Sequence, residues 1–375
     1  MNRSEPVSLP APMQPSVGAA QLNSLLERRE GVLALAPMQD VTDLPFWGLL
    51  HQYGGPDVYW TEYFRVHSTS TLEKQILRSI THNPTGRPAI AQLIGNDIPA
   101  LVRAAKELQK HPVAAIDLNL GCPAPVVYRK CAGGGLLREP KRIDAILGAL
   151  RETIVDRGIK FTVKTRVGFD STEVFEELLG IFARHRPDLV TVHGRTVSGM
   201  YRTPVRYDLI QRAASHLPFP VLANGNVWSA QRALDIVKST GVAGVMIGRG
   251  CIRNPWIFNQ IRALRAGLLP CWPTGRHVLT YVHALWNATE PVESKERLQV
   301  EKMKKYMNFL GAGIHEDAAV CHDFLHRVRR ATTRDEFFDI CRAHLDHDHP
   351  MKLEPVVAEN TASTPAPGES ESSHA

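Results

Sequence analysis

The sequence predicts an α/β protein, a (β/α)8 TIM barrel followed by a C-terminal helical bundle. Eight short apolar runs rich in β-branched residues alternate with stretches whose apolar residues recur at helical spacing. Eight such units favour a closed parallel barrel. An open doubly wound sheet is the alternative, but no Gly-x-Gly-x-x-Gly follows the first run, which counts against its dinucleotide-binding form. The expected strands cover residues 32–36, 57–61, 89–93, 115–118, 161–164, 189–192, 220–223 and 244–247.

Helices are expected after most of these strands. Asp97 and Ser229 stand where the N-caps of two such helices belong, because a short polar side chain there can accept a backbone N–H group. After about residue 262 strand patterns stop and only helical patterns remain. The expected helices cover residues 98–109, 142–153, 173–185 and 229–238, and then 277–289, 295–310, 318–330 and 334–344.

These patterns divide the chain of 375 residues into four parts. Residues 1–28 are expected to be a flexible leader, 29–262 the barrel, 263–352 a helical domain, and 353–375 a disordered tail rich in Ser, Thr, Pro and Gly. The leader lacks the apolar centre of a secretory signal, and no apolar run approaches the length of about 18 residues that spans a membrane. We therefore expect a cytoplasmic protein.

The composition narrows the possible chemistry. Apolar residues make up 43% of the chain, enough for a large core, and the net charge of +6 permits a polyanionic partner without requiring one. Six cysteines are scattered without a Cys-x-x-Cys pair. Their spacing fits neither a zinc site nor a disulfide framework, so no metal site is expected and any one of them could be catalytic.

Polar, charged or glycine-rich positions follow nearly every expected strand. Barrel enzymes carry their chemistry at these C-terminal strand ends. Any one such position is ordinary for a polar cap or turn, but together they favour an active site. The positions are Pro37-Met38-Gln39, Thr61-Glu62, Gln92, Asn119 to Pro123, Lys164 and Arg166, His193 to Thr196, Asn224-Gly225-Asn226, and Gly248-Arg249-Gly250.

The last two of these motifs predict a phosphate site. Glycines let backbone N–H groups approach an anion, and barrels often bind phosphate after strands seven and eight. Arg249 adds a charge-assisted hydrogen bond. A phosphorylated cofactor is therefore expected, with Lys164 placed to stabilise negative charge in the barrel mouth.

Cys122 is the expected proton donor. It lies on a constrained loop between Gly121 and Pro123, and a thiol with an ordinary pKa near 8.5 is mostly protonated at neutral pH. Cys131 precedes three glycines at 133–135, a stretch that we expect to be a flexible lid.

In this order the motifs resemble the tRNA-dihydrouridine synthase family, in its bacterial, FMN-dependent form. The similarity extends from about residue 33 to 262, and more loosely beyond. One departure follows His193-Gly194-Arg195-Thr196: many members carry Ala-Asp-Trp where this chain reads from Tyr201 to Asp208. The matching segments are Ala36-Pro37-Met38, Gln92 to Gly95, Asp117 to Pro123, Gly133 to Leu137, Val163 to Gly168, His193 to Thr196, Asn224 to Asn226, and Gly248 to Gly250.

The resemblance implies a tRNA-dihydrouridine synthase that uses FMN, with NADPH (or NADH) as electron donor. Reduced FMN would pass a hydride to C6 of uracil, and Cys122 would protonate C5. It also implies a tRNA-binding helical domain and no obligate protein partner. FMN contacts would come from Pro37, Met38, Gln39, Gln92, Lys164, His193, Asn224, Gly225, Asn226, Gly248 and Arg249, and substrate contacts from Asn119, Arg166 and Arg195.

Three alternatives stay open. A flavin enzyme acting on a free pyrimidine would share the barrel and the thiol but would not need the helical domain. An RNA-binding protein could retain the barrel without its activity. Within the helical domain the basic clusters at 302–305 and 327–334 are either solvated helix faces or an RNA contact surface.

Overall fold

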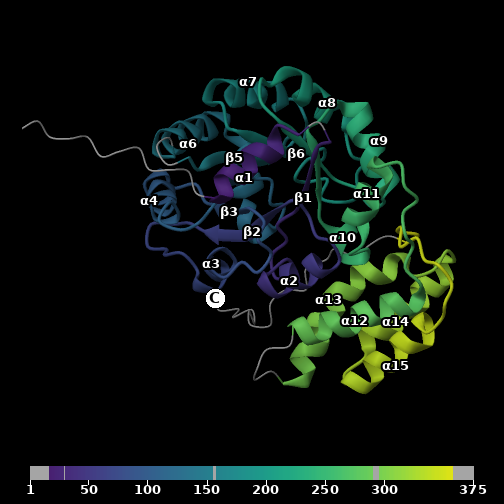
Figure 1. Cartoon of the computed structure of the whole chain (residues 1–375). Coiled ribbons are helices and arrows are strands. Elements are labelled where there is room, and N and C mark those ends of the chain that lie inside the picture. The colour runs from purple at the N-terminus through teal and green to yellow at the C-terminus, as the bar shows by residue number, and fades with distance from the viewer. Residues whose placement is uncertain (1–16, 29, 155–157, 290–294, 358–375) are drawn as a thin grey trace, which may run out of the picture.

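The computed structural model describes residues 17–28, 30–154, 158–289 and 295–357. Its centre is a closed barrel of eight parallel strands in sequence order, and β1 pairs with β8 to complete the ring (Figure 1). The predicted barrel and all eight predicted strands are confirmed. The strands are β1 (Val32–Leu35), β2 (Val58–Arg65), β3 (Ala89–Ile94), β4 (Ala115–Leu120), β5 (Lys160–Arg166), β6 (Leu189–His193), β7 (Val221–Asn224) and β8 (Gly244–Ile247).

Helices surround this ring and bury their apolar faces against it. Asp97 and Ser229 cap α4 and α9 as predicted, since their side chains accept the backbone N–H groups of Ala100 and Arg232. The surrounding helices are α2 (Leu44–Gln52), α3 (Lys74–Thr81), α4 (Ile98–Leu108), α6 (Pro140–Thr153), α7 (Phe175–His185), α8 (Tyr207–His216), α9 (Ala230–Thr240) and α11 (Ile257–Arg265), with the short turns α5 (Pro125–Tyr128), η1 (Gly133–Arg138) and α10 (Arg249–Arg253).

Helix α1 (Val17–Leu26) lies across the N-terminal end of the barrel (Figure 1). Leu22 and Leu25 pack against Val32, Ala115 and Leu189, the first residues of three strands. The prediction of a flexible leader over 1–28 is therefore wrong for this segment. The N-terminal end of the barrel presents apolar side chains, and α1 shields them from water. Residues 1–16 lie outside the described part of the chain.

The C-terminal part is the predicted helical bundle, and it packs beside α2 and α10 (Figure 1). The Tyr306 hydroxyl donates to Val41 O at 3.0 Å, and Lys302 pairs with Asp43 at 3.2 Å, which fixes the bundle against the loop that follows β1. The bundle consists of α12 (Gly275–Thr289), α13 (Glu296–Leu310), α14 (Ala318–Arg330) and α15 (Arg334–Leu345), with the turn η2 (Gly311–Gly313) after α13.

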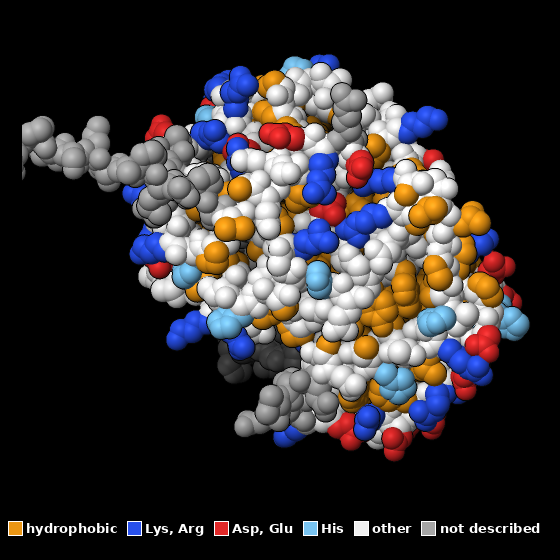
Figure 2. Space-filling view, in the orientation of Figure 1, with side chains coloured by type: hydrophobic (Ala, Val, Ile, Leu, Met, Phe, Trp, Pro, Cys, Tyr) orange, Lys and Arg blue, Asp and Glu red, His pale blue; other side chains and the backbone are white. Residues whose placement is uncertain are grey.

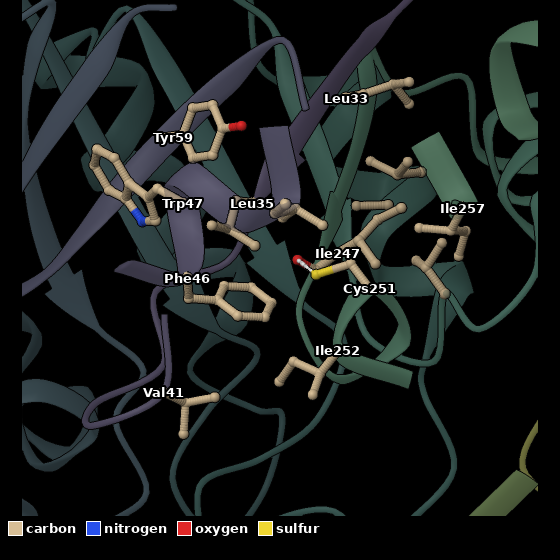
Figure 3. Close-up of a cluster of buried hydrophobic side chains, with 14 of the residues drawn as sticks. Leu33, Leu35, Val41, Phe46, Trp47, Tyr59, Ile247, Cys251, Ile252 and Ile257 are labelled. Atoms are coloured by element: carbon tan, nitrogen blue, oxygen red, sulfur yellow. Dashed lines mark hydrogen bonds between the residues drawn. The ribbon is translucent and has the colours of Figure 1, made fainter. Parts of the chain in front are cut away.

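An apolar cluster joins β1, β8, α2 and α10 beneath this contact (Figure 3). Phe46 and Trp47 of α2 are fully buried there, and Phe46 stacks on Tyr306 of α13 with ring centroids 5.9 Å apart. Barrel and bundle therefore share continuous packing, so the bundle is held in a fixed position beside the strand ends. No helix in the described part of the chain is long and apolar enough to span a membrane.

A strap, residues 350–357, returns from the bundle toward the barrel. Met351 N donates to Pro273 O at 2.7 Å, Val356 N donates to Ala312 O at 2.8 Å, and Leu353 is buried. The expected disordered tail of 353–375 is thus wrong for its first five residues, because backbone hydrogen bonds and burial order them. The rest of that tail lies outside the described residues.

Candidate active site

One large cavity of about 680 Å³ opens at the C-terminal ends of the strands. Every residue assigned a role from the sequence lines it except Gln92. The cavity residues among them are Pro37, Met38, Gln39, Asn119, Cys122, Lys164, Arg166, His193, Arg195, Asn224, Gly225, Asn226, Gly248 and Arg249.

Gln92 lies below the cavity floor in a chain of buried hydrogen bonds. Its amide Nε2 donates to Asp117 Oδ2 at 2.7 Å, and its Oε1 accepts from Asn119 Nδ2 at 2.8 Å. Asn119 Oδ1 in turn accepts the backbone N–H groups of Gly121 and Cys122, both at 2.9 Å. Gln92, expected at the cofactor, instead has both amide atoms engaged in holding the loop that carries the thiol.

Asp117 anchors this chain, and the sequence reasoning gave it no role. The Thr162 hydroxyl donates to its Oδ1 at 2.6 Å, and complete burial raises the pKa of Asp117 to about 6. The available signal was an acidic residue inside an otherwise apolar strand, since an unpaired buried charge is costly. Because Asp117 accepts from Gln92, it fixes which atom donates and which accepts in the hydrogen bonds that lead from Gln92 through Asn119 to the Cys122 backbone.

The Cys122 thiol is half-buried at the rim of the cavity. Burial raises its pKa above the ordinary value, and nearby Arg166 and Lys164 only partly oppose that shift. The thiol therefore remains protonated at neutral pH, which is the state that a general acid needs.

The glycines at 133–135 form a rigid backing for the Cys122 loop, so the prediction of a flexible lid is wrong. They belong to the buried turn η1, and Gly134 N donates to Cys122 O at 3.2 Å. A Cβ at Gly133 would lie 3.0 Å from Cys122 Cβ, and one at Gly134 would lie 2.7 Å from Cys122 O. The glycines are there because two backbone segments approach too closely for side chains.

Arg166 clamps the Cys122 loop to the loop that follows β6. It is 2% exposed, and its Nε donates to Gly121 O at 3.0 Å. Its Nη1 donates to Thr196 O at 2.7 Å and to Met200 O at 2.8 Å. Expected at the substrate, Arg166 does reach the cavity, but these three bonds commit it to holding two loops together.

The cavity carries a surplus of positive charge. Asp40 is the only acidic residue among the described residues that line it. The Lys164 ammonium makes no hydrogen bond or ion pair within the described part of the chain, and burial followed by Arg166 lowers its pKa to about 8. Burial and the neighbouring Arg249 likewise lower the pKa of Arg195 to about 10. Buried cations whose pKa values are lowered in this way favour an anionic ligand beside them.

The loops after β7 and β8 meet at this cluster. Gly225 has φ +118°, and a Cβ there would lie 3.0 Å from Val205 and 3.3 Å from the His193 ring. Asn226 Oδ1 accepts from Arg195 Nη2 at 3.1 Å and from Arg249 Nη2 at 3.5 Å. The two motifs that predicted a phosphate site therefore share one basic pocket.

Comparison with known proteins decides the family. The family model described as dihydrouridine synthase matches residues 34–343. The chain belongs to the dihydrouridine synthase family. Members of this family are flavin-dependent oxidoreductases, so this chain is an enzyme of that class, and the resemblance read from the sequence motifs is confirmed.

Curated relatives agree with this assignment. The chain is 32% identical over 231 residues to "tRNA-dihydrouridine synthase B" of Pasteurella multocida, which covers 61% of this chain and 68% of the relative. It is 34% identical over 241 residues to a "tRNA-dihydrouridine(16) synthase" of Neisseria meningitidis, covering 63% and 72% of the two chains. The fold is similar to that of histamine dehydrogenase from Rhizobium sp. 4-9, with a TM-score of 0.52, 14% identity, and coverage of 88% of this chain and 65% of that one.

The residues present fit a flavin with a phosphate. An unpaired Lys164 and three neighbouring arginines supply charge for the anion, while Gly225 and Gly248 leave room that a Cβ would fill. A Cβ at Gly248 would lie 3.0 Å from Met38 Sδ, so the glycine brings the β8 loop close to the apolar residues after β1. Apolar side chains and cations within one cavity match an aromatic ring system that carries an anionic tail.

Tyr201 is a cavity residue that the sequence reasoning passed over as part of a family departure. Its ring lies 4.5 Å from the Arg249 guanidinium and 5.4 Å from that of Arg166. An aromatic face between two guanidiniums offsets part of their mutual repulsion. An aromatic residue shortly after a basic strand-end motif was the only signal for it.

The basic clusters of the helical domain divide between two environments. Lys304 pairs with Glu301 at 2.6 Å, and Arg327 pairs with Asp323 at 3.8 Å. Figure 2 shows acidic and basic side chains interspersed over the visible face of the bundle. Lys305 and Asn308 of α13 instead line the cavity, and Arg329 Nε donates to Asn308 Oδ1 at 2.9 Å. Most residues of the clusters therefore lie on helix faces away from the cavity, and Lys305, 3.9 Å from Asp40, is the member that borders the active site.

Proposed function

We propose that this enzyme is a tRNA-dihydrouridine synthase that reduces the C5–C6 double bond of uridines in tRNA, using FMN and NADPH. One observation carries the proposal: a protonated thiol, Cys122, shares a cavity with a surplus of cations in a chain of the dihydrouridine synthase family. Relatives that are named as tRNA-dihydrouridine synthases support the choice of substrate.

The cofactor would be held by both sides of the cavity. Pro37, Met38 and Gln39 would contact its ring, and Lys164 would pair with negative charge on the ring. The loops after β7 and β8, where Arg195 and Arg249 converge on Asn226, would hold its phosphate. When bound and reduced by NADPH, FMN supplies the hydride that C6 of the uracil receives.

Cys122 supplies the proton that completes the reduction. The S–H bond breaks, the proton goes to C5 of the uracil, and the thiolate recovers a proton from water afterwards. Arg166 and Lys164 lie near enough to stabilise the thiolate while it exists. Asn119 accepts a hydrogen bond from the Cys122 backbone, so the loop that carries the thiol is already ordered before the uracil binds.

The substrate has to offer an unstacked base, because a barrel mouth cannot reach a base inside a helix. Lys305 lines the cavity, and Arg329 of α14 lies next to it through its hydrogen bond to the cavity residue Asn308, so both can contact phosphates of the flanking strand. A free pyrimidine would make no use of these groups.

The experiment is mass spectrometry of unmodified tRNA incubated with purified enzyme, FMN and NADPH. A mapped uridine that gains two hydrogens supports the proposal and identifies the position. If tRNA is unchanged while a free pyrimidine base is reduced, the substrate class proposed here is wrong. If the purified protein binds tRNA but neither holds flavin nor oxidises NADPH, the catalytic proposal is wrong.

A further inference from the structure

The strap at residues 350–357 contributes one wall of the active-site cavity. Pro355, Val356 and Val357 line the cavity together with Phe309 of α13. The region matched by the family model ends at residue 343, so this wall comes from outside it.

The strap is built into the fold and is not a chance contact. Val356 N and Val357 N both donate to Ala312 O, at 2.8 and 3.3 Å. A Cβ at Gly313 would lie 2.3 Å from Glu354 O, so the turn η2 has to present a glycine for the strap to pass. Leu353, 1% exposed, anchors the segment just before it reaches the cavity.

The strap and the thiol lie on opposite sides of the mouth. Cys122 follows β4, whereas the strap bonds to Ala312 in the turn η2, and its Glu354 interacts electrostatically with Arg253 at the end of α10, the helix that follows β8. In a closed ring of eight strands, β4 and β8 are four positions apart and face one another. A uridine placed at Cys122 therefore has the strap across from it, on the side where the helical bundle begins.

The chemistry of the strap differs from that of the rest of the mouth. Its three cavity residues carry no charge, and Val356 keeps 45% of its surface exposed although it is a large apolar residue. Lys305 and Asn308 line the same cavity, and Lys305 lies 3.9 Å from Asp40. A cavity that offers both an exposed apolar surface and a cation suits a nucleotide, because the base or ribose packs on the apolar group while the phosphate meets the charge.

We propose that Val356, supported by Pro355 and Val357, contacts the nucleotide adjacent to the target uridine and helps to select which uridine is reduced. The inference rests on the proposed function, because it takes RNA to be the substrate. It deepens that function by naming a specificity-determining contact in a segment outside the matched family region.

The first test compares Val356→Ala and Val356→Asp with wild-type enzyme and with the same substitutions at Leu269. Leu269 is 95% exposed and is not a cavity residue, so it controls for loss of surface apolar area or gain of charge. Loss of the Val356 methyl groups should raise the KM for tRNA about fivefold. The added carboxylate should raise it about tenfold or more, because it repels phosphates. Flavin absorbance and melting temperature report that each variant is folded and loaded.

The second test replaces Val356 with the photo-crosslinking residue p-benzoylphenylalanine in the full chain and maps the nucleotide that cross-links to tRNA. A cross-link to a neighbour of the reduced uridine supports the contact. A cross-link elsewhere in the tRNA, or an unchanged KM in both Val356 variants, overturns it. If wild-type enzyme reduces tRNA while these variants behave as wild type, only the strap proposal fails; if wild-type enzyme reduces no uridine, the proposed function fails.

Discussion

Asn119 Oδ1 accepts the backbone N–H group of Cys122 at 2.9 Å, so the next-to-last residue of β4 fixes the position of the thiol three residues later. Asn119 is itself oriented by Gln92, and Gln92 by Asp117. A carboxylate can only accept hydrogen bonds, so Asp117 determines which way each amide in this chain points. The direction of the hydrogen bonds is thereby transmitted from the barrel interior to the catalytic loop.

Asp117→Asn should therefore lower kcat although Asp117 does not touch the cavity. The new amide keeps one acceptor oxygen and gains an NH2 group, so it no longer accepts from both Gln92 Nε2 and the Thr162 hydroxyl. Where the NH2 group faces Gln92, that side chain has to flip, and the mismatch passes to Asn119 and then to the Cys122 backbone. We expect kcat to fall about tenfold or more through misplacement of the thiol, with flavin content retained. Steady-state kinetics on tRNA measure this. Thr162→Val, which removes one donor and reverses no polarity, should have the smaller effect; equal effects of the two variants would contradict the polarity argument.

Cys122→Ala should retain bound flavin and lose most turnover. Removing a general acid typically costs a factor of about 10² to 10⁴ in rate. Single-turnover reduction of tRNA by the flavin-loaded variant measures the loss. The matched control is Cys131→Ala, since Cys131 is also half-buried but does not line the cavity. Wild-type rates in the Cys122 variant would show that another group donates the proton.

Flavin affinity should fall as pH rises through about 8. The pKa of Lys164 is lowered to about 8, so its ammonium is fully present below that pH and is lost above it. An anion that binds the ammonium form loses affinity as the amine is deprotonated. Fluorescence titration of FMN from about pH 7 to about pH 9.5 measures the trend. His193 does not titrate in this range, because burial lowers its pKa well below the ordinary value.

Lys164→Met should weaken FMN binding at neutral pH about tenfold, the value of a charge-assisted hydrogen bond, and should remove most of this pH dependence. Lys160→Met is the control on the same strand, because Lys160 pairs with Asp188 at 3.1 Å and lies outside the cavity. An unchanged pH profile in Lys164→Met would assign the titration to a different group.

The sequence allowed the strand-end residues to be predicted because a parallel barrel brings the C-terminal end of every strand to one rim. Lys164, His193 and Asn224 needed no further information. The position of Gln92 could not be predicted in this way. Whether its side chain reaches the cavity or lies below it depends on the register of β3 against β4, where Gln92 pairs with Asp117. That register is set by closure of the whole ring, which local patterns do not contain.

Segments without a local pattern were misjudged for a related reason. The strap is ordered by backbone hydrogen bonds to Ala312, and backbone bonding leaves no trace in side-chain composition. The glycines at 133–135 have the composition of a flexible loop, yet they are buried because another segment needs their space. In both cases the partner that imposes order is close in space but is not indicated by the local sequence.

The last prediction concerns α1, the helix that was expected to be a leader. Leu22 is fully buried against the N-terminal end of the barrel, so Leu22→Ala should lower the free energy of unfolding by about 3 kcal/mol, through lost apolar contact and the cavity left behind. Urea denaturation followed by tryptophan fluorescence measures this, since Trp60 packs in the same cluster. Val17→Ala on the same helix is the control, because Val17 is 77% exposed and should change little. Equal stability of the Leu22 variant and wild type would mean that α1 does not cover the barrel in solution.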